Sequence, residues 1–358
     1  MDKKRIYFVD DLAGASLCGI GTYRKHLSNV LISRGYEVHV LSIAYGNKYG
    51  CVKENGATLH FLKDRNGSLT RDDLVDAKVK NSEDNVLLFN ISDIESLLVA
   101  SKELPLARHV LVIHNFVWSE TLDGDTQRLE HLMQTHGATK EEREIYADIC
   151  NERYAMNIAD MVVCLSKSAK VIICRQYNIP SRKVKVIPNG IAPFNTNTSR
   201  SDFFLFVGRL TEAKGFPELA EAANAAGVKL VALGEGERYQ CERIDYRGHV
   251  RDVSTWYDRA MAVAIPSHCE QCAYVGLEAM AHGCLIVSSD AIGLRDMFTE
   301  KNAVIFKKGD AESLKIALER VITMSKEEKR QKLHAMKNTL RGHSLEKMAY
   351  NYEKKVFS

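Results

Sequence analysis

The chain of 358 residues lacks any run of 18 apolar residues, so the sequence contains no segment with the composition of a transmembrane helix. The start of the chain soon meets acidic residues, and we therefore expect no secretory signal and a cytoplasmic protein. An excess of one charge is also lacking, because 49 Lys and Arg face 46 Asp and Glu. The net charge of +3 argues against a dedicated nucleic-acid binder, although it is compatible with a local basic patch.

A paired cysteine framework is missing too. The nine cysteines are odd in number, scattered, and mostly placed within apolar runs, which is typical of reduced, buried thiols. Only Cys269 and Cys272 have CxxC spacing, and two further ligands at a suitable spacing are lacking for a zinc site. We therefore assign no metal.

Two common nucleotide-binding motifs are absent as well. Gly19 and Gly21 lie in a glycine-rich stretch, residues 14–22, between the first predicted strand and helix, but Arg24 occupies the place of the third glycine of the dinucleotide fingerprint. The second predicted strand also ends without the usual acidic residue, which disfavours a dehydrogenase. No Gly-Lys-Ser or Gly-Lys-Thr occurs, which excludes a Walker loop. The stretch can still bind phosphate through helix amides, with a plain tight turn as the alternative.

What the sequence does contain is an alternation of short apolar runs with helical stretches, which is typical of parallel sheets covered by helices. The first series predicts strands at 6–9, 38–42, 58–61, 86–90, 109–114, 161–165 and 184–187, with a helix at 22–34. The second series predicts strands at 203–207, 229–233, 244–246, 262–266, 285–289 and 304–306, with helices near 217–226, 274–282 and 311–323.

The polar stretch 195–201 separates the two series and lacks hydrophobic periodicity, so it predicts a linker. The fold class is therefore α/β, with two doubly wound, Rossmann-like domains at residues 1–190 and 202–340, and two such domains facing each other would form a cleft. Sheets of this kind bind ligands beyond the carboxyl ends of their strands. The loops at those ends are accordingly the candidate sites.

The loop after the first strand of the second domain carries two cations between glycines, in the order Gly208-Arg209 and Lys214-Gly215. Arginine can hold two phosphate oxygens at once and lysine adds a compact charge, so the pair suits a diphosphate. Two solvated surface cations are the alternative interpretation.

A second candidate loop precedes the helix predicted at 274–282. Glu270 falls in this loop and Glu278 inside the helix, while the helix start offers backbone amides to a phosphate. The two carboxylates can accept hydrogen bonds from sugar hydroxyls. Glu278 could instead be a satisfied buried residue, but an acid among apolar neighbours needs partners and so indicates a site.

Taken in order, these residues resemble glycosyltransferase family 4, retaining enzymes of GT-B fold with a glycosyltransferases group 1 domain. The resemblance covers essentially the whole chain. It is carried by Gly19-Ile20-Gly21, Asn189-Gly190, Gly208-Arg209, Lys214-Gly215, Leu233-Gly234-Glu235-Gly236, and Glu270 with Glu278.

The resemblance implies transfer of a sugar, hexosyl in type, from a nucleoside diphosphate, UDP foremost, to an acceptor hydroxyl. It implies neither a metal nor another cofactor, and it points to synthesis of cell-surface polysaccharide, glycolipid or glycoconjugate. A non-catalytic subunit that binds sugar nucleotides is the alternative. A hydrolase that uses Glu270 and Glu278 as its acid pair is disfavoured, because one short segment supplies both carboxylates.

By the same resemblance Arg209 and Lys214 hold the diphosphate, Glu278 holds the ribose, and Glu270 faces the transferred sugar. The implied catalytic residues are Glu270, Arg209, Lys214 and His114. The implied donor-binding residues are Gly19, Gly21, Gly208, Arg209, Lys214, His249, Val250, Glu270, Ala273, Tyr274, Val275 and Glu278. Many family members have Phe-Gly where this chain has Cys272-Ala273, but Ala273 is small enough to let a phosphate approach.

The sequence does not decide which acceptor the protein uses or whether it associates with a membrane. The acceptor is a glycan, a lipid-linked molecule or a peptide, and no nucleic acid is expected. The polar stretch 118–156 could cover the acceptor or form a solvated helical excursion. The residues at 341–358 resemble the family's last helix, which returns to the first domain. Basic residues near the start leave open peripheral association with the inner face of a membrane, namely Lys3, Lys4, Arg5, Arg24 and Lys25.

Overall fold

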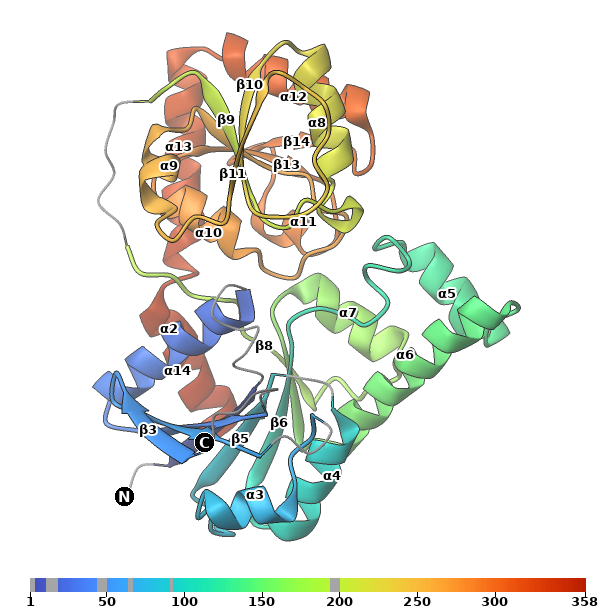
Figure 1. Cartoon of the computed structure of the whole chain (residues 1–358), viewed down its shortest axis with the longest axis vertical. Helices are drawn as coiled ribbons and strands as arrows, with labels where there is room; N and C mark the ends of the chain where they lie inside the picture. The colour runs from blue at the N-terminus through green and yellow to red at the C-terminus, as the bar shows by residue number, and fades with distance from the viewer. Residues whose placement is uncertain (1–3, 11–18, 44–49, 64–66, 91–92, 194–199) are drawn as a thin grey trace. The chain divides into compact units, whose positions relative to one another are not determined.

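The computed structural model describes residues 4–10, 19–43, 50–63, 67–90, 93–193 and 200–358. The chain divides into two compact units (Figure 1). Unit 1 comprises Met1–Trp118, Thr126–Gly190 and Leu345–Ser358, and unit 2 comprises Ser119–Asp125 and Ile191–Ser344. A short segment from the first half of the sequence, Ser119–Asp125, therefore belongs to the second unit, while the end of the chain belongs to the first.

Unit 1 is built on one eight-stranded sheet in the order β3-β4-β2-β1-β5-β6-β7-β8. The strands are β1 (Arg5–Asp10), β2 (Glu37–Ser42), β3 (Gly50–Glu54), β4 (Ala57–Phe61), β5 (Asn85–Phe89), β6 (Arg108–Ile113), β7 (Met161–Cys164) and β8 (Val184–Val186). All neighbours are parallel except β3 and β4. The central strands β1 and β5 are buried almost throughout, which explains why they read as continuous apolar runs.

The edge strand β3 is an addition that the sequence analysis missed. Every residue of β3 is exposed, so the strand shows no apolar periodicity. It forms an antiparallel hairpin with β4 across Asn55-Gly56, and both of these residues have positive φ, 50° and 86°. An Asn-Gly pair between two strands is a strong hairpin signal, and it is the one feature that could have revealed β3.

The helices of unit 1 include one from the far end of the sequence. They are α2 (Gly19–Ser33), α3 (Arg71–Asp76), α4 (Ile94–Glu103), α5 (Thr126–Thr135), α6 (Lys140–Ile158), α7 (Lys167–Arg175), α14 (Leu345–Tyr352) and the π-helical turn η2 (Glu353–Phe357). Helix α14 packs against α2, where the hydroxyl oxygens of Tyr23 and Tyr352 lie 2.6 Å apart. An ion pair of 2.6 Å between Arg34 and Glu353 adds to this contact.

Unit 2 contains a six-stranded parallel sheet in the order β11-β10-β9-β12-β13-β14. Its strands are β9 (Phe203–Val207), β10 (Lys229–Leu233), β11 (Ile244–Gly248), β12 (Ala262–Ile265), β13 (Leu285–Ser289) and β14 (Val304–Phe306). Its helices are η1 (Glu212–Lys214), α8 (Phe216–Ala225), α9 (Ser254–Arg259), α10 (Tyr274–Ala281), α11 (Leu294–Met297), α12 (Ala311–Thr323) and α13 (Lys326–Arg341). The strand order reverses between β9 and β12, which is where a doubly wound sheet binds its ligand.

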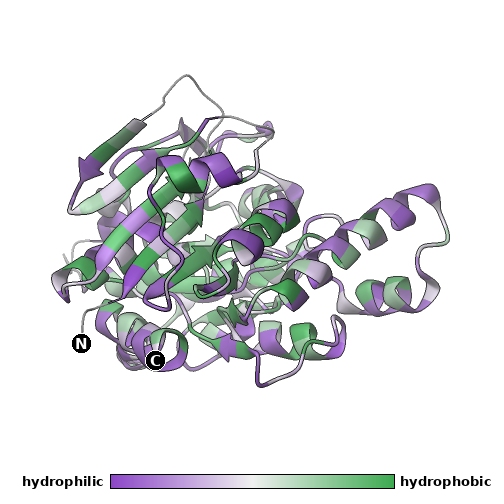
Figure 2. Cartoon of the chain, turned by 90° about the horizontal axis from the view of Figure 1, so that it is seen from below, coloured by the Kyte–Doolittle hydropathy of each residue, from purple (hydrophilic) through white to green (hydrophobic). Residues whose placement is uncertain are grey.

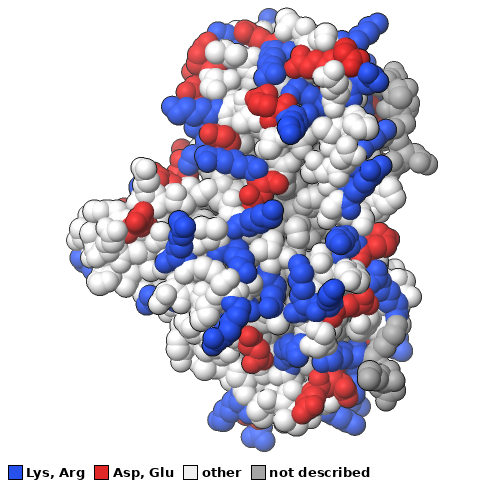
Figure 3. Space-filling view, turned by 180° about the vertical axis from the view of Figure 1, so that it is seen from behind, with Lys and Arg blue, Asp and Glu red and all other residues white. Residues whose placement is uncertain are grey.

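The prediction of two parallel-sheet α/β domains is confirmed, and apolar residues concentrate in the strands and along one side of the helices (Figure 2). Within the described residues, no helix combines the length and the apolar character that crossing a bilayer requires. The nearly balanced total charge conceals local patches, because Lys and Arg side chains gather in several places on the surface (Figure 3).

Candidate donor-binding site

The loops after β9 and β12 flank the point where the strand order of unit 2 reverses, and they carry Lys214 and Glu270. The Lys214 Nζ lies 2.5 Å from the Glu270 Oε1, and the two side chains are 27% and 20% exposed. Ser267 Oγ donates a hydrogen bond to the same carboxylate oxygen at 3.3 Å. The structure therefore brings these two predicted site residues together, in a place that solvent can still reach.

The approach of these two loops depends on Gly215. This residue has a φ of +66°, and a Cβ atom there would lie 2.1 Å from the backbone oxygen of Pro266. Another hydrogen bond joins the loops, because His268 N donates to Ala213 O at 3.0 Å. Glycine at 215 is thus required for the close approach that pairs Lys214 with Glu270.

Arg209 has a different partner from Lys214. Its Nη2 lies 2.5 Å from the Glu120 Oε1, and the side chains are 60% and 50% exposed. Exposed ion pairs contribute little to stability, typically about 0 to 1 kcal/mol. This pair therefore leaves the guanidinium available to an anionic ligand, and convergence of Arg209 and Lys214 on one diphosphate stays a prediction.

The carboxylate of Glu278 is held from one side. Tyr257, which is fully buried, donates a hydrogen bond to Glu278 Oε2 at 2.7 Å. Burial raises the pKa of Glu278, although the hydrogen bond from Tyr257 and the nearby His282 act in the opposite direction. Within the described residues Oε1 accepts no hydrogen bond, so this oxygen can accept one from a ligand hydroxyl.

Helix α10 begins directly after the loop that carries Glu270. Its N-cap residue is Ala273, which supplies no side-chain hydrogen bond. The first turn, with Tyr274 and Val275, therefore presents backbone N–H groups and the positive end of the helix dipole at this edge of the sheet. Such a helix start is suited to a phosphate group.

The residues predicted to flank the base follow the edge strand β11. Gly234 N donates to Gly248 O at 2.8 Å, and Gly208 N donates to Leu233 O at 2.9 Å, so the loops after β9, β10 and β11 are joined. Gly234 cannot carry a side chain, because a Cβ atom there would lie 1.9 Å from Gly208 O. His249 is exposed and Val250 half-buried immediately beyond Gly248, at the same edge of the sheet.

Three predicted site residues belong to unit 1. Gly19 and Gly21 lie in the first turn of α2, because this helix begins three residues before the predicted start at residue 22. The preceding part of the glycine-rich stretch, residues 14–18, lies outside the described residues. His114 follows β6, donates from Nε2 to Asn90 Oδ1 at 3.1 Å, and lies edge-on to the Tyr23 ring. Burial lowers the pKa of His114 to about 3, so its ring is neutral at neutral pH.

Sequence analysis did not single out His268, which is 5% exposed and lies between two carboxylates. Its Nδ1 hydrogen-bonds Asp123, and its Nε2 lies 2.9 Å from the Glu218 Oε1. Burial by itself lowers the pKa of His268, but the interactions with the Glu218 and Asp123 carboxylates outweigh burial and raise it. The only local signal was the position of this histidine two residues before Glu270.

The CxxC pair does not form a disulfide. Both thiols are reduced and buried, and burial raises the pKa of Cys269 to about 12. A thiol with so high a pKa is a poor nucleophile and a poor metal ligand. Among the described residues, no group of three or more potential metal-binding side chains lies together.

Comparison with known protein families matches both halves of the chain. Residues 18–193 match the family Glycosyltransferase Family 4, and residues 201–324 match Glycosyl transferases group 1. The fold and these two matches define a glycosyltransferase-type protein of GT-B fold. The chain belongs to glycosyltransferase family 4, with a group 1 domain as its second half, and the resemblance noted in the sequence is confirmed.

Solved structures share this fold at low sequence identity. A sucrose-phosphate synthase from Thermosynechococcus elongatus aligns with a TM-score of 0.74 and 16% identity over 98% of each chain. The Anabaena HepE protein, solved in complex with UDP-glucose, aligns with a TM-score of 0.70 and 15% identity over 99% of each chain.

Two curated relatives match over part of their length. An uncharacterized glycosyltransferase of Methanocaldococcus jannaschii is 32% identical over 222 residues, which cover 50% of this chain and 56% of the relative. A probable transglycosylase of Burkholderia thailandensis is 28% identical over 113 residues, 31% of each chain. The matched part of the chain thus spans about half the length of the first relative and about a third of the second.

Proposed function

We propose that the chain is a retaining glycosyltransferase that moves a hexosyl group from a nucleoside diphosphate, UDP foremost, to an acceptor hydroxyl. Family membership supports this proposal, as does the occurrence of UDP-glucose in the complex of HepE. The observation that carries it is the pairing of Lys214 with Glu270 beside the start of α10, at the reversal point of the unit 2 sheet.

Lys214 supplies the positive charge that the reaction needs. In the free protein Glu270 neutralises this charge at 2.5 Å. A donor diphosphate offers Lys214 a stronger anionic partner, and the exchange releases the Glu270 carboxylate to accept hydrogen bonds from hydroxyls of the sugar. The ion pair thus keeps both groups in place before the donor arrives.

Catalysis then rests on position and charge. As the bond from the anomeric carbon to the diphosphate breaks, negative charge accumulates on the diphosphate, and Lys214, Arg209 and the first amides of α10 stabilise it. We assign no protein nucleophile. A diphosphate oxygen accepts the proton of the acceptor hydroxyl, which attacks the anomeric carbon from the face that the diphosphate leaves.

Glu278 selects the nucleotide portion of the donor. Tyr257 fixes one oxygen of its carboxylate, while the other oxygen accepts a hydrogen bond from a ribose hydroxyl. His249 and Val250 flank the base, and the backbone at Gly21 approaches the phosphates. His114, whose ring is neutral, hydrogen-bonds the sugar.

The setting we propose is synthesis of cell-surface polysaccharide, glycolipid or glycoconjugate by a cytoplasmic protein that associates peripherally with a membrane. The acceptor is a glycan or a lipid-linked or peptide molecule. A structure of the same fold is that of WaaB, a lipopolysaccharide outer core galactosyltransferase, which is 18% identical with a TM-score of 0.67.

A donor screen tests the proposal. The purified chain is incubated with a panel of nucleotide sugars, with water and simple glycans as acceptors, and release of nucleoside diphosphate is measured. We expect release with one or a few donors, and its loss in Glu270→Ala and Lys214→Ala. Tight binding of a nucleoside diphosphate without release or transfer from any donor would instead favour the non-catalytic subunit.

A further inference from the structure

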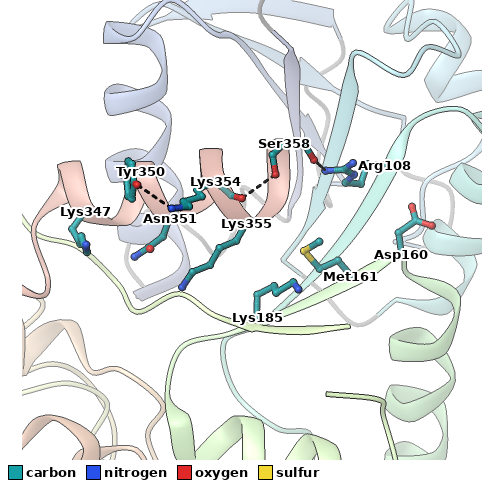
Figure 4. Close-up of a pocket in the computed structure, with 10 residues that line it drawn as sticks. All are labelled: Arg108, Asp160, Met161, Lys185, Lys347, Tyr350, Asn351, Lys354, Lys355 and Ser358. Atoms are coloured by element: carbon teal, nitrogen blue, oxygen red, sulfur yellow. Dashed lines mark hydrogen bonds between the residues drawn. The ribbon is translucent and has the colours of Figure 1, made fainter. Parts of the chain in front are cut away.

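A basic pocket of about 800 Å³ lies in unit 1 between the end of the chain and the sheet (Figure 4). Arg108 begins β6 and Asp160 directly precedes β7, so the pocket opens at the amino ends of these strands. His114, the predicted site residue on this part of the sheet, follows the opposite end of β6. The pocket is therefore distinct from the carboxyl-end loops to which the donor was assigned.

Cations dominate the walls of this pocket. They are contributed by β6, by β8, by α14 and by the turn η2, namely Arg108, Lys185, Lys347, Lys354 and Lys355. Lys355 extends from η2 toward β8, which carries Lys185 on the opposite wall (Figure 4). Because the cations come from four separate elements, the fold and not the local sequence gathers them.

The one acidic side chain that lines the pocket, that of Asp160, is already engaged. Asp160 accepts a hydrogen bond from His109 N at 2.7 Å, and the His109 Nδ1 lies 3.4 Å from the same oxygen. Burial would raise the pKa of Asp160, but these interactions with His109 outweigh burial and lower it. Asp160 is thus held at its own wall and pairs with none of the lining cations.

Three of these cations donate hydrogen bonds to main-chain oxygens, and one of those oxygens belongs to the carboxylate at Ser358. Arg108 donates to Ser358 O at 2.7 Å, Lys185 to Arg182 O at 2.9 Å, and Lys355 to Val186 O at 3.1 Å. In the described part of the chain, the side chains of Lys185, Lys354 and Lys355 form no ion pair with an Asp or Glu carboxylate. Burial lowers the pKa of Lys355, and repulsion from Lys347, Lys170 and Lys185 adds to the effect. The lining thus carries five cations, whereas its carboxylates are those of Asp160 and of the last residue, Ser358.

We propose that this pocket binds a ligand that carries phosphate groups and is separate from the donor nucleotide. Arginine and lysine together are the side chains that recognise phosphate oxygens, and the volume falls within the range of small-molecule sites, roughly 300 to 1,000 Å³. The phosphate belongs either to a soluble molecule or to a lipid headgroup. The alternative is a group of independently solvated lysines, and it predicts no binding that depends on the pocket.

Bound phosphate would also bridge the two walls of the pocket. One wall is the end of the chain, α14 and η2, and the other is the edge of the sheet at β6 to β8. A ligand that neutralises cations on both walls should therefore hold the C-terminal segment on unit 1. Because such a ligand binds only the folded state, it should raise the melting temperature of the protein.

The test uses pyrophosphate as the soluble probe, in an Arg209→Ala/Lys214→Ala background that removes the cations of the proposed donor site. Calorimetry measures its affinity for this protein, for a pocket variant with Lys185→Gln and Lys355→Gln, and for a control variant with Lys102→Gln and Lys140→Gln. The control lysines are exposed in unit 1, on α4 and α6, and do not line the pocket. We expect the pocket variant to bind at least about tenfold more weakly, and the control to bind unchanged.

A second arm measures sedimentation of the same proteins with vesicles of phosphatidylglycerol and phosphatidylcholine, compared with phosphatidylcholine alone. Binding to the anionic vesicles that the pocket variant loses and the control keeps identifies a lipid headgroup as the phosphate source. Binding of pyrophosphate alone identifies a soluble ligand. Binding of neither probe, or equal binding by the pocket and control variants with unchanged melting curves, overturns the proposal. Because the background lacks Arg209 and Lys214, this result is independent of the proposed transfer reaction.

Discussion

Asp123 and His268 form a hydrogen bond although 145 residues separate them in the sequence. Asp123 lies in the segment Ser119–Asp125, and the fold places this segment against the loop that carries Glu270. Gly124 allows the approach, because a Cβ atom there would lie 2.4 Å from His268 O. Lys308 adds a hydrogen bond of 2.5 Å to Asp123 O. The loop with the proposed sugar-facing carboxylate is thus supported by a distant part of the chain.

The stabilisation that His268 gives to the loop carrying Glu270 should depend on pH. Because its carboxylate partners raise the pKa of His268 above 6.5, the stabilisation from the charged ring is complete below pH 6.5 and is lost as pH rises through the folded-state pKa. His268→Gln should therefore destabilise unit 2 at pH 6, by about 1.5 to 3 kcal/mol as for a charged hydrogen bond, and less at pH 9. Urea unfolding of the two proteins at both pH values measures the difference.

The histidines of lowered pKa, such as His26, His39 and His60, affect both proteins alike, so the comparison isolates His268. Asp123→Asn should reproduce part of the effect, because it removes one of the two carboxylates. A loss of stability that is the same at pH 6 and pH 9 would show that the ring is neutral and acts by packing alone.

Lys214 and Arg209 should differ in their importance for turnover. Lys214 is partly buried beside Glu270, whereas Arg209 is 60% exposed. Lys214→Ala should lower kcat about a hundredfold, as does removal of one group that stabilises a leaving anion, and Arg209→Ala should lower it less. Steady-state transfer by the single and double variants, with the exposed Lys301→Ala as control, measures this. Changes confined to KM would mean that the cations only bind the donor.

Arg209 and Lys214 pair with different carboxylates in the free protein. Any energetic coupling between their substitutions in transfer therefore reports on the state with donor bound. If both bind one diphosphate, the loss in the double variant should be smaller than the product of the two single losses. Independent losses that simply multiply would place the two cations on separate groups of the donor.

Glu278→Ala should weaken nucleoside diphosphate binding while leaving the fold intact. The expected loss is about 1.5 to 3 kcal/mol, the value of a hydrogen bond to a charged group. Burial raises the pKa of this carboxyl, so affinity in the unmodified protein should fall as pH is lowered through that pKa, and the variant should lack this dependence. Calorimetry with UDP at pH 5 and pH 8, alongside melting curves, tests both statements. Equal affinity for the two proteins would remove Glu278 from the donor site.

The sequence predicted the strands well because central parallel strands are continuous apolar runs, and strands such as β9 and β13 match their predicted ranges. It assigned Lys214 and Glu270 to one donor site only through the family resemblance, whereas their contact follows from the strand order, which sets the loops after β9 and β12 side by side. It could not predict the contact of Asp123 with His268, which depends on how a remote segment folds back. Nor could it predict the basic pocket, whose lysines look like ordinary solvated charges until α14 packs on unit 1.

Glu152 on α6 gives a prediction for unit 1 that is independent of the donor site. It is 1% exposed and accepts a hydrogen bond from Tyr177, and burial raises its pKa from 4.5 to about 7. The folded state therefore holds this proton more tightly than the unfolded state does, so stability falls as pH rises from 4.5 to 7, by up to about 3 kcal/mol. Glu152→Gln, which keeps an acceptor for Tyr177, should remove this loss.

Glu152→Gln should accordingly match the unmodified protein near pH 4.5 and exceed it in stability at pH 8. Urea unfolding followed by tryptophan fluorescence in a Trp256→Phe background measures this, because Trp118 then reports on unit 1 alone. Glu144→Gln is the matched control, since Glu144 lies on the same helix with its side chain 68% exposed and should have no such effect. If Glu144→Gln raises stability at pH 8 as much as Glu152→Gln does, the cause is the change in helix charge. If Glu152→Gln raises no stability at pH 8, Glu152 is buried as a charged, fully satisfied group.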